Sequence, residues 1–275
     1  MATIAETTPV EEPRRDHLSG TPRAYSVDRW IYVFTAASFI VIVLAGFVPS
    51  SIEKAAAVQA GARPPFPLVM HVHALLMGTF LLLLLAQTAL VATGRCAQHM
   101  RLGLVSMALV PAIVVVGFLL ARGNYHGMWA ASQAAPPQAR AELMGVIGIL
   151  DNILLLQLRI GILFPIFIWI GLRARRGEPG LHKRMMILAT AVALPAGIDR
   201  IPWLPSTMPL SPLAPDLYTL VAISPMLAWD LLRNRFVHRA YWMWLGLFLP
   251  FAVVVHSLWD TAWWHGAAKV VMGIA

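Results

Sequence analysis

Three histidines and an aspartate have the residue types of a metal site: His71, His73, His256 and Asp260. His256 and Asp260 are four residues apart and share one face of a regular helix, so they could bind one metal ion. His71 and His73 are about 200° apart around a helix axis, so only one of them can join such a site unless the helix begins irregularly after Pro67. The set predicts three ligands for zinc or iron and one open position for water. Alternatively, His71 and His73 are interfacial residues at a helix start, and Asp260 contacts water.

Four further charged residues, Asp151, Arg159, Asp199 and Arg200, are candidate catalytic residues. They lie in apolar stretches, where charged side chains are costly and commonly functional. We expect an ion pair between Arg159 and Asp199, which lie at matching depth in their predicted helices. Arg200 should pair with Asp151 or with Asp260. The alternative is a buried network that only fixes helix packing.

Histidines also begin three predicted helices beside basic residues, at His99, His182 and His238. A histidine pair on neighbouring helices can ligate haem iron, but histidines at basic turns are more often solvated, and we favour that interpretation. The sequence has one cysteine and no Met-x-x-Met or Cys-x-x-Cys cluster, so copper transfer lacks support. It also lacks a phosphate-binding glycine loop, Gly-x-Ser-x-Gly and His-Glu-x-x-His.

Apolar segments long enough to cross a bilayer must position these groups. The chain has 275 residues, of which 59% are hydrophobic and only 12% are charged, whereas soluble domains carry about 25% charged residues. We predict an all-α polytopic bundle of seven transmembrane helices. Each segment has the roughly 20 apolar residues that a span needs: Trp30–Val48, Leu68–Thr93, Leu102–Ala121, Ile147–Leu172, Met185–Leu204, Leu217–Leu232 and Tyr241–Trp263. The sixth is the weakest because it holds Asp230, which Arg233 and Arg235 should neutralise.

Basic residues are distributed unequally between the two sides of these spans. Fourteen Lys and Arg residues fall on the side of the N-terminus and five on the other, which predicts a cytoplasmic N-terminus and an external C-terminus. We expect residues 1–29 to be a disordered cytoplasmic tail and residues 30–275 to be the transmembrane domain of a bacterial inner-membrane protein. The net charge of +8 follows from this loop pattern and does not indicate nucleic-acid binding. A weak repeat suggests three hairpins after the first helix, with chance as the alternative.

Several motifs resemble a family of uncharacterised bacterial multi-pass membrane proteins. They are the His-x-His-Ala stretch from His71, Gln87, the His-x-Arg-Leu-Gly turn from His99, and the segments 181–190 and 200–202. The resemblance covers about residues 68–202 and implies no established activity. The turn from His99 is also loosely similar to turns in membrane cytochromes of the b type, which would imply haem b. Those proteins hold haem through histidines inside facing helices, whereas the only deep histidine here is His256.

Three functions are compatible with these residues. The first is redox or hydrolytic chemistry at a transition metal (zinc or iron) or haem b, acting on a lipid-soluble substrate from the outer leaflet. The second is a proton-coupled transporter whose path is lined by Arg159, Asp199 and Arg200. The third is a non-catalytic subunit of a larger membrane complex.

Overall fold

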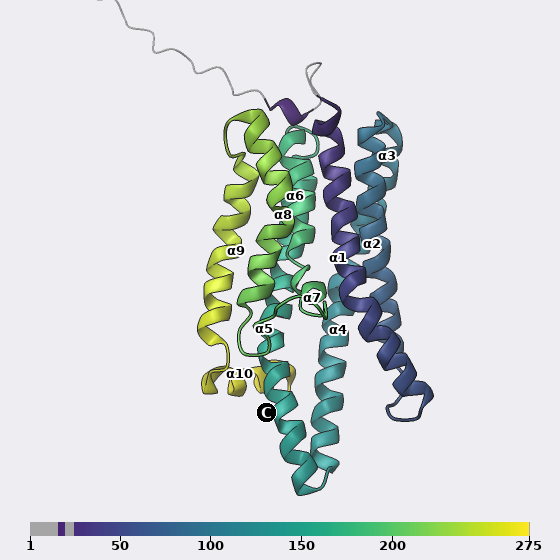
Figure 1. Cartoon of the computed structure of the whole chain (residues 1–275), viewed down its shortest axis with the longest axis vertical. Coiled ribbons are helices and arrows are strands. Elements are labelled where there is room, and N and C mark those ends of the chain that lie inside the picture. The colour runs from purple at the N-terminus through teal and green to yellow at the C-terminus, as the bar shows by residue number, and fades with distance from the viewer. Residues whose placement is uncertain (1–15, 20–24, 275) are drawn as a thin grey trace, which may run out of the picture.

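The computed structural model describes residues 16–19 and 25–274, and every regular element in these residues is a helix (Figure 1). Most helices run along one axis as a bundle, whereas α10 lies across one end of it (Figure 1). We name this the α10 end and the opposite end, where η1 lies, the η1 end. The elements in chain order are η1 (His17–Ser19), α1 (Ser26–Gln59), α2 (Leu68–Ala92), α3 (Cys96–Gly103), α4 (Val105–Ala134), α5 (Pro137–Ala174), α6 (Pro179–Ala191), α7 (Pro195–Ile198), α8 (Leu213–Asn234), α9 (Arg239–Leu258) and α10 (Ala262–Met272).

Five helical segments in the described part of the chain are long and apolar enough to cross a membrane. They are α1, α2, the α3–α4 unit over Cys96–Ala134, α5 and α9, with mean hydropathies from 1.6 to 2.7. The prediction of an all-helical membrane bundle is therefore confirmed at this level. The further predicted spans correspond to α6 with α7 and to α8, and the number seven stays a prediction.

The predicted fifth span, Met185–Leu204, is not one continuous helix. The helix α6 has 13 residues and the helix α7 has four. Between them, the N–H groups of residues 192–194 bond to carbonyls three residues earlier, so the chain tightens before Pro195. Proline has no N–H to continue the α-helical pattern, and its ring clashes with the preceding turn. The chain after α7 contains no helix until Leu213.

Each basic turn of the weak repeat, at His99, His182 and His238, is followed about a dozen residues later by a proline, and these prolines differ in their effect. The helices α4 and α9 continue through Pro111 and Pro250, whereas α6 has already ended before Pro195. The short α7 packs closely on α1, because a Cβ on Gly46 would lie only 2.0 Å from the Gly197 carbonyl oxygen. This close approach fixes the broken segment against the first helix.

The centre of the bundle is α6, which contacts α1, α5, α8 and α9. Its residues Met185, Ile187 and Leu188 are fully buried. Trp244 of α9 donates its indole N–H to the Leu188 carbonyl at 2.8 Å and stacks on Phe248, with ring centroids 4.4 Å apart. These contacts fix α9 against α6 and place the Phe248 ring toward α5.

A buried ionic network joins helices at the η1 end. The Arg184 side chain of α6 has no exposed area and pairs with Asp230 of α8 at 2.5 Å and with Asp16 at 2.8 Å. Burial alone would raise the pKa of Asp16, but the charges of Arg184 and Lys183 hold it well below its usual value. The predicted neutralisation of Asp230 by nearby arginines of α8 is therefore wrong, because the partner comes from α6.

The described part of the predicted tail packs on this network. The His17 N–H donates to Asn234 Oδ1 at 2.9 Å, and the Asn234 amide donates to Asp16 Oδ1 at 3.1 Å. Asp28, also within the predicted tail, pairs with Arg233 at 2.9 Å and lies in α1, which begins at Ser26. Residues 1–15 and 20–24 of that tail lie outside the described residues.

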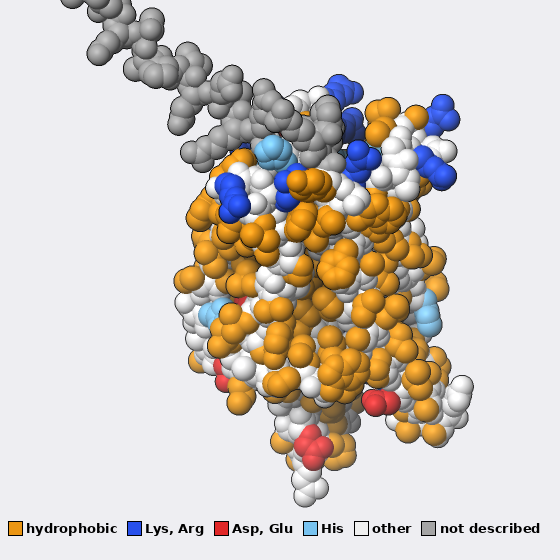
Figure 2. All heavy atoms as spheres, turned by 45° about the horizontal axis from the view of Figure 1, so that its top comes forward, with side chains coloured by type: hydrophobic (Ala, Val, Ile, Leu, Met, Phe, Trp, Pro, Cys, Tyr) orange, Lys and Arg blue, Asp and Glu red, His pale blue; other side chains and the backbone are white. Residues whose placement is uncertain are grey.

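Apolar side chains cover the flanks of the bundle (Figure 2). Exposed examples on three of its helices are Phe34, Val41, Leu75, Leu82 and Val253. Soluble monomers rarely expose so continuous an apolar surface. In the same view, Lys and Arg side chains gather at the η1 end (Figure 2). An apolar belt beneath a basic end is the surface expected of a bundle that spans a bilayer.

Candidate functional site

A buried arginine and aspartate join α5 to α8. Arg159 Nη1 and Nη2 donate to Asp216 Oδ2 and Oδ1 at 2.9 and 2.5 Å, and the two side chains are 0% and 9% exposed. His256 Nε2 of α9 lies 3.2 Å from the same Asp216 Oδ2. The Arg159 guanidinium also lies 4.8 Å from the Phe248 ring centroid. The contacts satisfy the two terminal nitrogens of the Arg159 guanidinium, whereas its buried Nε has no hydrogen-bond partner among the described residues. The arrangement favours a role in packing three helices together.

The predicted ion pair between Arg159 and Asp199 is therefore wrong. Asp199 follows α7, and its carboxylate accepts a hydrogen bond from Ser206 Oγ at 3.3 Å. The prediction assumed that one straight helix carried Asp199 to the depth of Arg159. The break after α6 removes that helix, and Asp216 of the next helix takes the place of Asp199.

Arg200 does not pair with either of the carboxylates predicted for it. Its guanidinium donates to the Ala196 carbonyl of α7 and lies 5.0 Å from the Phe47 ring centroid of α1. The residue is exposed. Arg200 therefore belongs to the contact between α7 and α1 and not to a site at the α10 end.

The predicted metal ligands His71 and His73 lie on α2. His71 is exposed and packs edge-on against Phe66, with ring centroids 6.1 Å apart. His73 faces α4, where its Cε1 lies 3.5 Å from the position that a Cβ on Gly117 would occupy. Its Nδ1 is buried and has no hydrogen-bond partner among the described residues. The two rings thus have different surroundings, as their spacing predicts.

The other two predicted ligands, His256 and Asp260, do not share a helix face. The helix α9 ends at Leu258, and Asp260 adopts a left-handed backbone with φ of 57°. His256 contacts Asp216, whereas Asp260 contacts residues of α5 and α10. Within the described ranges, no group of three or more His, Cys, Asp or Glu side chains could hold a metal ion. Binding of zinc, iron or haem b by the predicted set stays a prediction.

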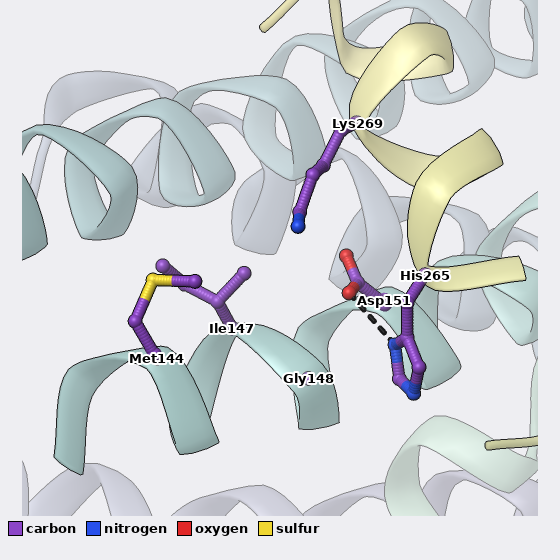
Figure 3. Close-up of a pocket in the computed structure, with 6 residues that line it drawn as sticks. All are labelled: Met144, Ile147, Gly148, Asp151, His265 and Lys269. Carbon is purple, nitrogen blue, oxygen red and sulfur yellow. Dashed lines mark hydrogen bonds and ion pairs between the residues drawn. The ribbon is translucent and has the colours of Figure 1, made fainter. Parts of the chain in front are cut away.

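A different histidine, His265 of α10, lies between two carboxylates. Its Nδ1 is 2.9 Å from Asp151 Oδ2, the contact drawn in Figure 3, and its Nε2 is 3.1 Å from Asp260 Oδ1. The Asp151 side chain is 2% exposed, whereas that of Asp260 is 76% exposed. The imidazole therefore links a buried carboxylate to an exposed one.

Local structure explains why His265 reaches this position. The chain turns sharply at Asp260, and the Thr261 hydroxyl then caps α10 by accepting from the Trp264 N–H at 3.2 Å. The Asn152 amide oxygen accepts from the Asp260 N–H at 2.9 Å, and the Trp264 indole donates to the Asp151 carbonyl at 2.6 Å. These bonds hold the start of α10 against α5.

Asp151 has a second side-chain donor on α4. The Tyr125 hydroxyl donates to Asp151 Oδ1 at 2.5 Å, while the other carboxylate oxygen faces His265. Both oxygens of this buried carboxylate are therefore hydrogen-bonded, which offsets the cost of burying it. Tyr125 is itself buried and fixes the carboxylate in one orientation.

The two contacts of His265 restrict where protons can be. An ionised carboxylate only accepts hydrogen bonds, and a neutral imidazole has one N–H. Both contacts are hydrogen bonds only if the ring carries two protons or if one carboxyl group is protonated. The three groups Asp151, His265 and Asp260 therefore form a continuous chain of polar contacts from an exposed carboxylate to a buried one.

A pocket with a volume of about 220 Å³ lies beside this chain of groups (Figure 3). In Figure 3 the Lys269 side chain extends from α10 toward it. Lys269 makes no ion pair within the described part of the chain, and its ammonium lies 5.8 Å from the Trp129 ring centroid. The pocket is smaller than the 300–1,000 Å³ or so typical of sites that enclose a drug-sized ligand. The residues that line it are Met144, Ile147, Gly148, Asp151, His265 and Lys269.

Sequence reasoning found Asp151 and Asp260 but missed the residues that join them. His265 and Lys269 follow the last predicted span, where nothing in the hydropathy pattern indicates that the chain returns across the end of the bundle. Two signals were present: Thr261 is a favourable helix cap, and His265 and Trp264 follow it at the spacing of a first helical turn.

The fold and its apolar flanks define the class of this chain as an integral membrane protein of the helical-bundle type. No family model, curated protein or solved structure matches the chain.

Proposed function

We propose that this is a multi-pass inner-membrane protein that binds a lipid-soluble weak acid in the pocket at the α10 end and exchanges a proton with it through His265. In this proposal the η1 end faces the cytoplasm, and the α10 end lies at the outer face of the membrane. The concentration of Lys and Arg at the η1 end supports that orientation. The contact of His265 with both Asp151 and Asp260 is the observation that carries the proposed chemistry.

The pocket has the two kinds of surface that an amphiphile needs. Met144 and Ile147 offer apolar contact, and Lys269 offers an ammonium group that forms no ion pair with a carboxylate of the described residues. A volume of about 220 Å³ suits a polar head and the first carbons of a chain, with the remainder lying against the apolar flank. An anionic oxygen is the head group that best complements an ammonium next to an N–H-bearing imidazole.

Proton exchange follows from the arrangement of the three acid–base groups. When the acid arrives protonated from the lipid, its proton can pass to the Asp151–His265–Asp260 chain, and its anion can pair with Lys269. The exposed Asp260 then connects the chain to water. Binding should therefore release a proton to solvent, in a step that depends on His265 and not only on Lys269.

Laurate is a suitable probe because it joins a carboxyl head to an apolar chain. Calorimetric titration of the purified protein should show saturable binding that Lys269→Gln weakens about tenfold or more, since hydrogen bonds to charged groups contribute about 1.5–3 kcal/mol. Lys54→Gln, which removes another lysine of the same predicted side, should leave binding unchanged, and dodecanol should bind weakly. Titrations below the carboxyl pKa of the probe, where lauric acid still carries its proton, in two buffers of different ionisation enthalpy should reveal proton release in the wild type and less of it in His265→Gln. Equal laurate affinity in the wild type and Lys269→Gln would refute the proposal.

A further inference from the structure

Two histidines from different helices meet near the η1 end, far from the proposed acid site. The rings of His99 on α3 and His182 on α6 have centroids 6.2 Å apart and planes inclined by 76°. Two imidazoles that share one ion through bonds of about 2 Å have centroids roughly 5–6.3 Å apart, with the largest separation for a linear arrangement. Neither residue is fully exposed, although a basic turn suggests solvated side chains. The separation of the rings therefore fits a shared ligand.

Hydrogen bonding sets the tautomer of His182. Its Nδ1 lies 2.7 Å from the Gly171 carbonyl oxygen of α5, and a carbonyl only accepts, so Nδ1 carries the proton and Nε2 has a free lone pair. A neutral imidazole whose other nitrogen donates to a carbonyl is the usual arrangement of a metal-ligating histidine.

Two polar atoms in the same region are buried without partners. His99 Nδ1 and Gln87 Oε1 make no hydrogen bond within the described ranges. The Gln87 amide nitrogen lies 3.1 Å from the position that a Cβ on Gly103 would occupy, and Gly103 is one turn after His99 on α3. Buried polar groups without partners are rare and commonly mark an ion or a water. A group bound beside His99 would give at least one of these two atoms a partner.

A thioether lies next to the carbonyl that orients His182. Met186 Sδ is 3.1 Å from the position that a Cβ on Gly171 would occupy. Met186 is also four residues after His182, so the two share one face of α6. Gly171, which has no side chain, is thus contacted both by the His182 imidazole, through its carbonyl, and by the Met186 sulfur.

We propose that His99, His182 and Met186 bind one copper(I) ion. A thioether sulfur is a soft ligand that selects Cu(I), and imidazole binds copper as well as zinc, whereas the usual ligands of Zn²⁺ are thiolate, imidazole and carboxylate without thioether. The neighbouring Arg175 adds positive charge, which disfavours a divalent ion more than a monovalent one. This site is independent of the pocket at the α10 end. Its ligands come from two helices, so a Met-x-x-Met motif is not needed to form it.

Competition for Cu(I) tests the site directly. The purified full-length protein is given Cu(I) under ascorbate with bathocuproine disulfonate as the competing chelator. We expect one Cu(I) per chain, and at least about tenfold weaker retention in His182→Ala and His99→Ala, because each variant loses a direct ligand. His238→Asn, which changes a third histidine of the same end, should retain Cu(I) as the wild type does. X-ray absorption of the wild-type complex should show a Cu–S distance that is absent in Met186→Leu.

The outcomes separate copper from a simpler occupant. A single water between His99 and Gln87 would satisfy the same unpartnered atoms, and it predicts that the wild type retains no Cu(I) against the chelator. That result, or equal retention in the wild type and His182→Ala, would overturn the proposal. Met186→Leu is close to isosteric and should fold normally, so a misfolded histidine variant still leaves the Cu–S measurement decisive. Zn²⁺ binding as tight as Cu(I), and unchanged by Met186→Leu, would also refute it.

Discussion

Replacing Asp216 by asparagine should destabilise the bundle strongly, because it leaves the Arg159 charge buried without a counter-charge. The Arg159 side chain is 0% exposed, and both of its bonds to Asp216 are shorter than 3 Å. Asparagine keeps one acceptor oxygen but removes the negative charge and the second acceptor. It also replaces the oxygen that faces His256 at 3.2 Å.

Two known magnitudes bracket the expected cost. Breaking a buried ion pair by removing one partner typically costs about 3–5 kcal/mol, whereas an ordinary interhelical hydrogen bond in a membrane contributes about 0.6 kcal/mol. The bidentate geometry and complete burial of Arg159 place this pair near the first value. Because Asn retains one acceptor, we expect about 3 kcal/mol for Asp216→Asn and about 5 kcal/mol for Asp216→Ala. A loss of 3 kcal/mol lowers the folding equilibrium constant more than about 100-fold.

Unfolding by SDS in mixed micelles, followed by tryptophan fluorescence, measures this cost. The matched control is Asp199→Asn, which removes the same charge from a carboxylate that accepts a 3.3 Å hydrogen bond from the Ser206 hydroxyl. We expect the control to cost about 0.5 kcal/mol or less. The double variant Arg159→Met/Asp216→Leu should recover most of the loss, because apolar replacements of a buried ion pair are often neutral.

Three results would contradict this reasoning. A cost below about 1 kcal/mol for Asp216→Asn would show that the pair acts as an ordinary polar contact. A larger loss for Asp199→Asn than for Asp216→Asn would restore the pairing with Arg159 that the sequence suggested. A double variant as unstable as the sum of the single ones would show that the two charges are not energetically coupled.

Two other predictions concern the packing of α1 and the protonation of His238. Gly46→Ala should destabilise the bundle by about 1–3 kcal/mol in the same SDS assay, because the new Cβ would lie 2.0 Å from the Gly197 carbonyl oxygen, whereas Gly78→Ala, which meets nothing within 4 Å, should be nearly neutral. Burial and the charge of Arg184 lower the pKa of His238 to about 4 from 6.5; the unfolded chain therefore binds a proton first, and stability should fall as the pH falls from 6.5 toward 4. His238→Asn retains a helix-capping residue, so a stability loss between about pH 7 and pH 4.5 that is as large in this variant as in the wild type would contradict the assignment.

The sequence could predict the helices better than the contacts between them. Apolar length identified the membrane helices because a bilayer requires about 20 residues with satisfied backbone groups. Depth along each helix was then counted from a constant rise per residue, which fails where a helix stops. The break before Pro195 displaced Asp199 from the depth of Arg159, and the turn at Asp260 removed the helix face that His256 and Asp260 should have shared.

The acid–base groups at the α10 end illustrate why such a site depends on the end of the chain. Asp151 is buried on α5. Its described partner from a neighbouring span is the Tyr125 hydroxyl of α4, which is not a basic group, whereas its basic partner is His265 of α10. Only the return of α10 across the bundle brings His265 beside Asp151 and Lys269 to the edge of the same pocket. A bond from the Asp260 N–H to Asn152 closes that turn. The chemistry proposed here therefore requires an intact link between α9 and α10, because the linker both orients His265 and contributes the carboxylate on its exposed side.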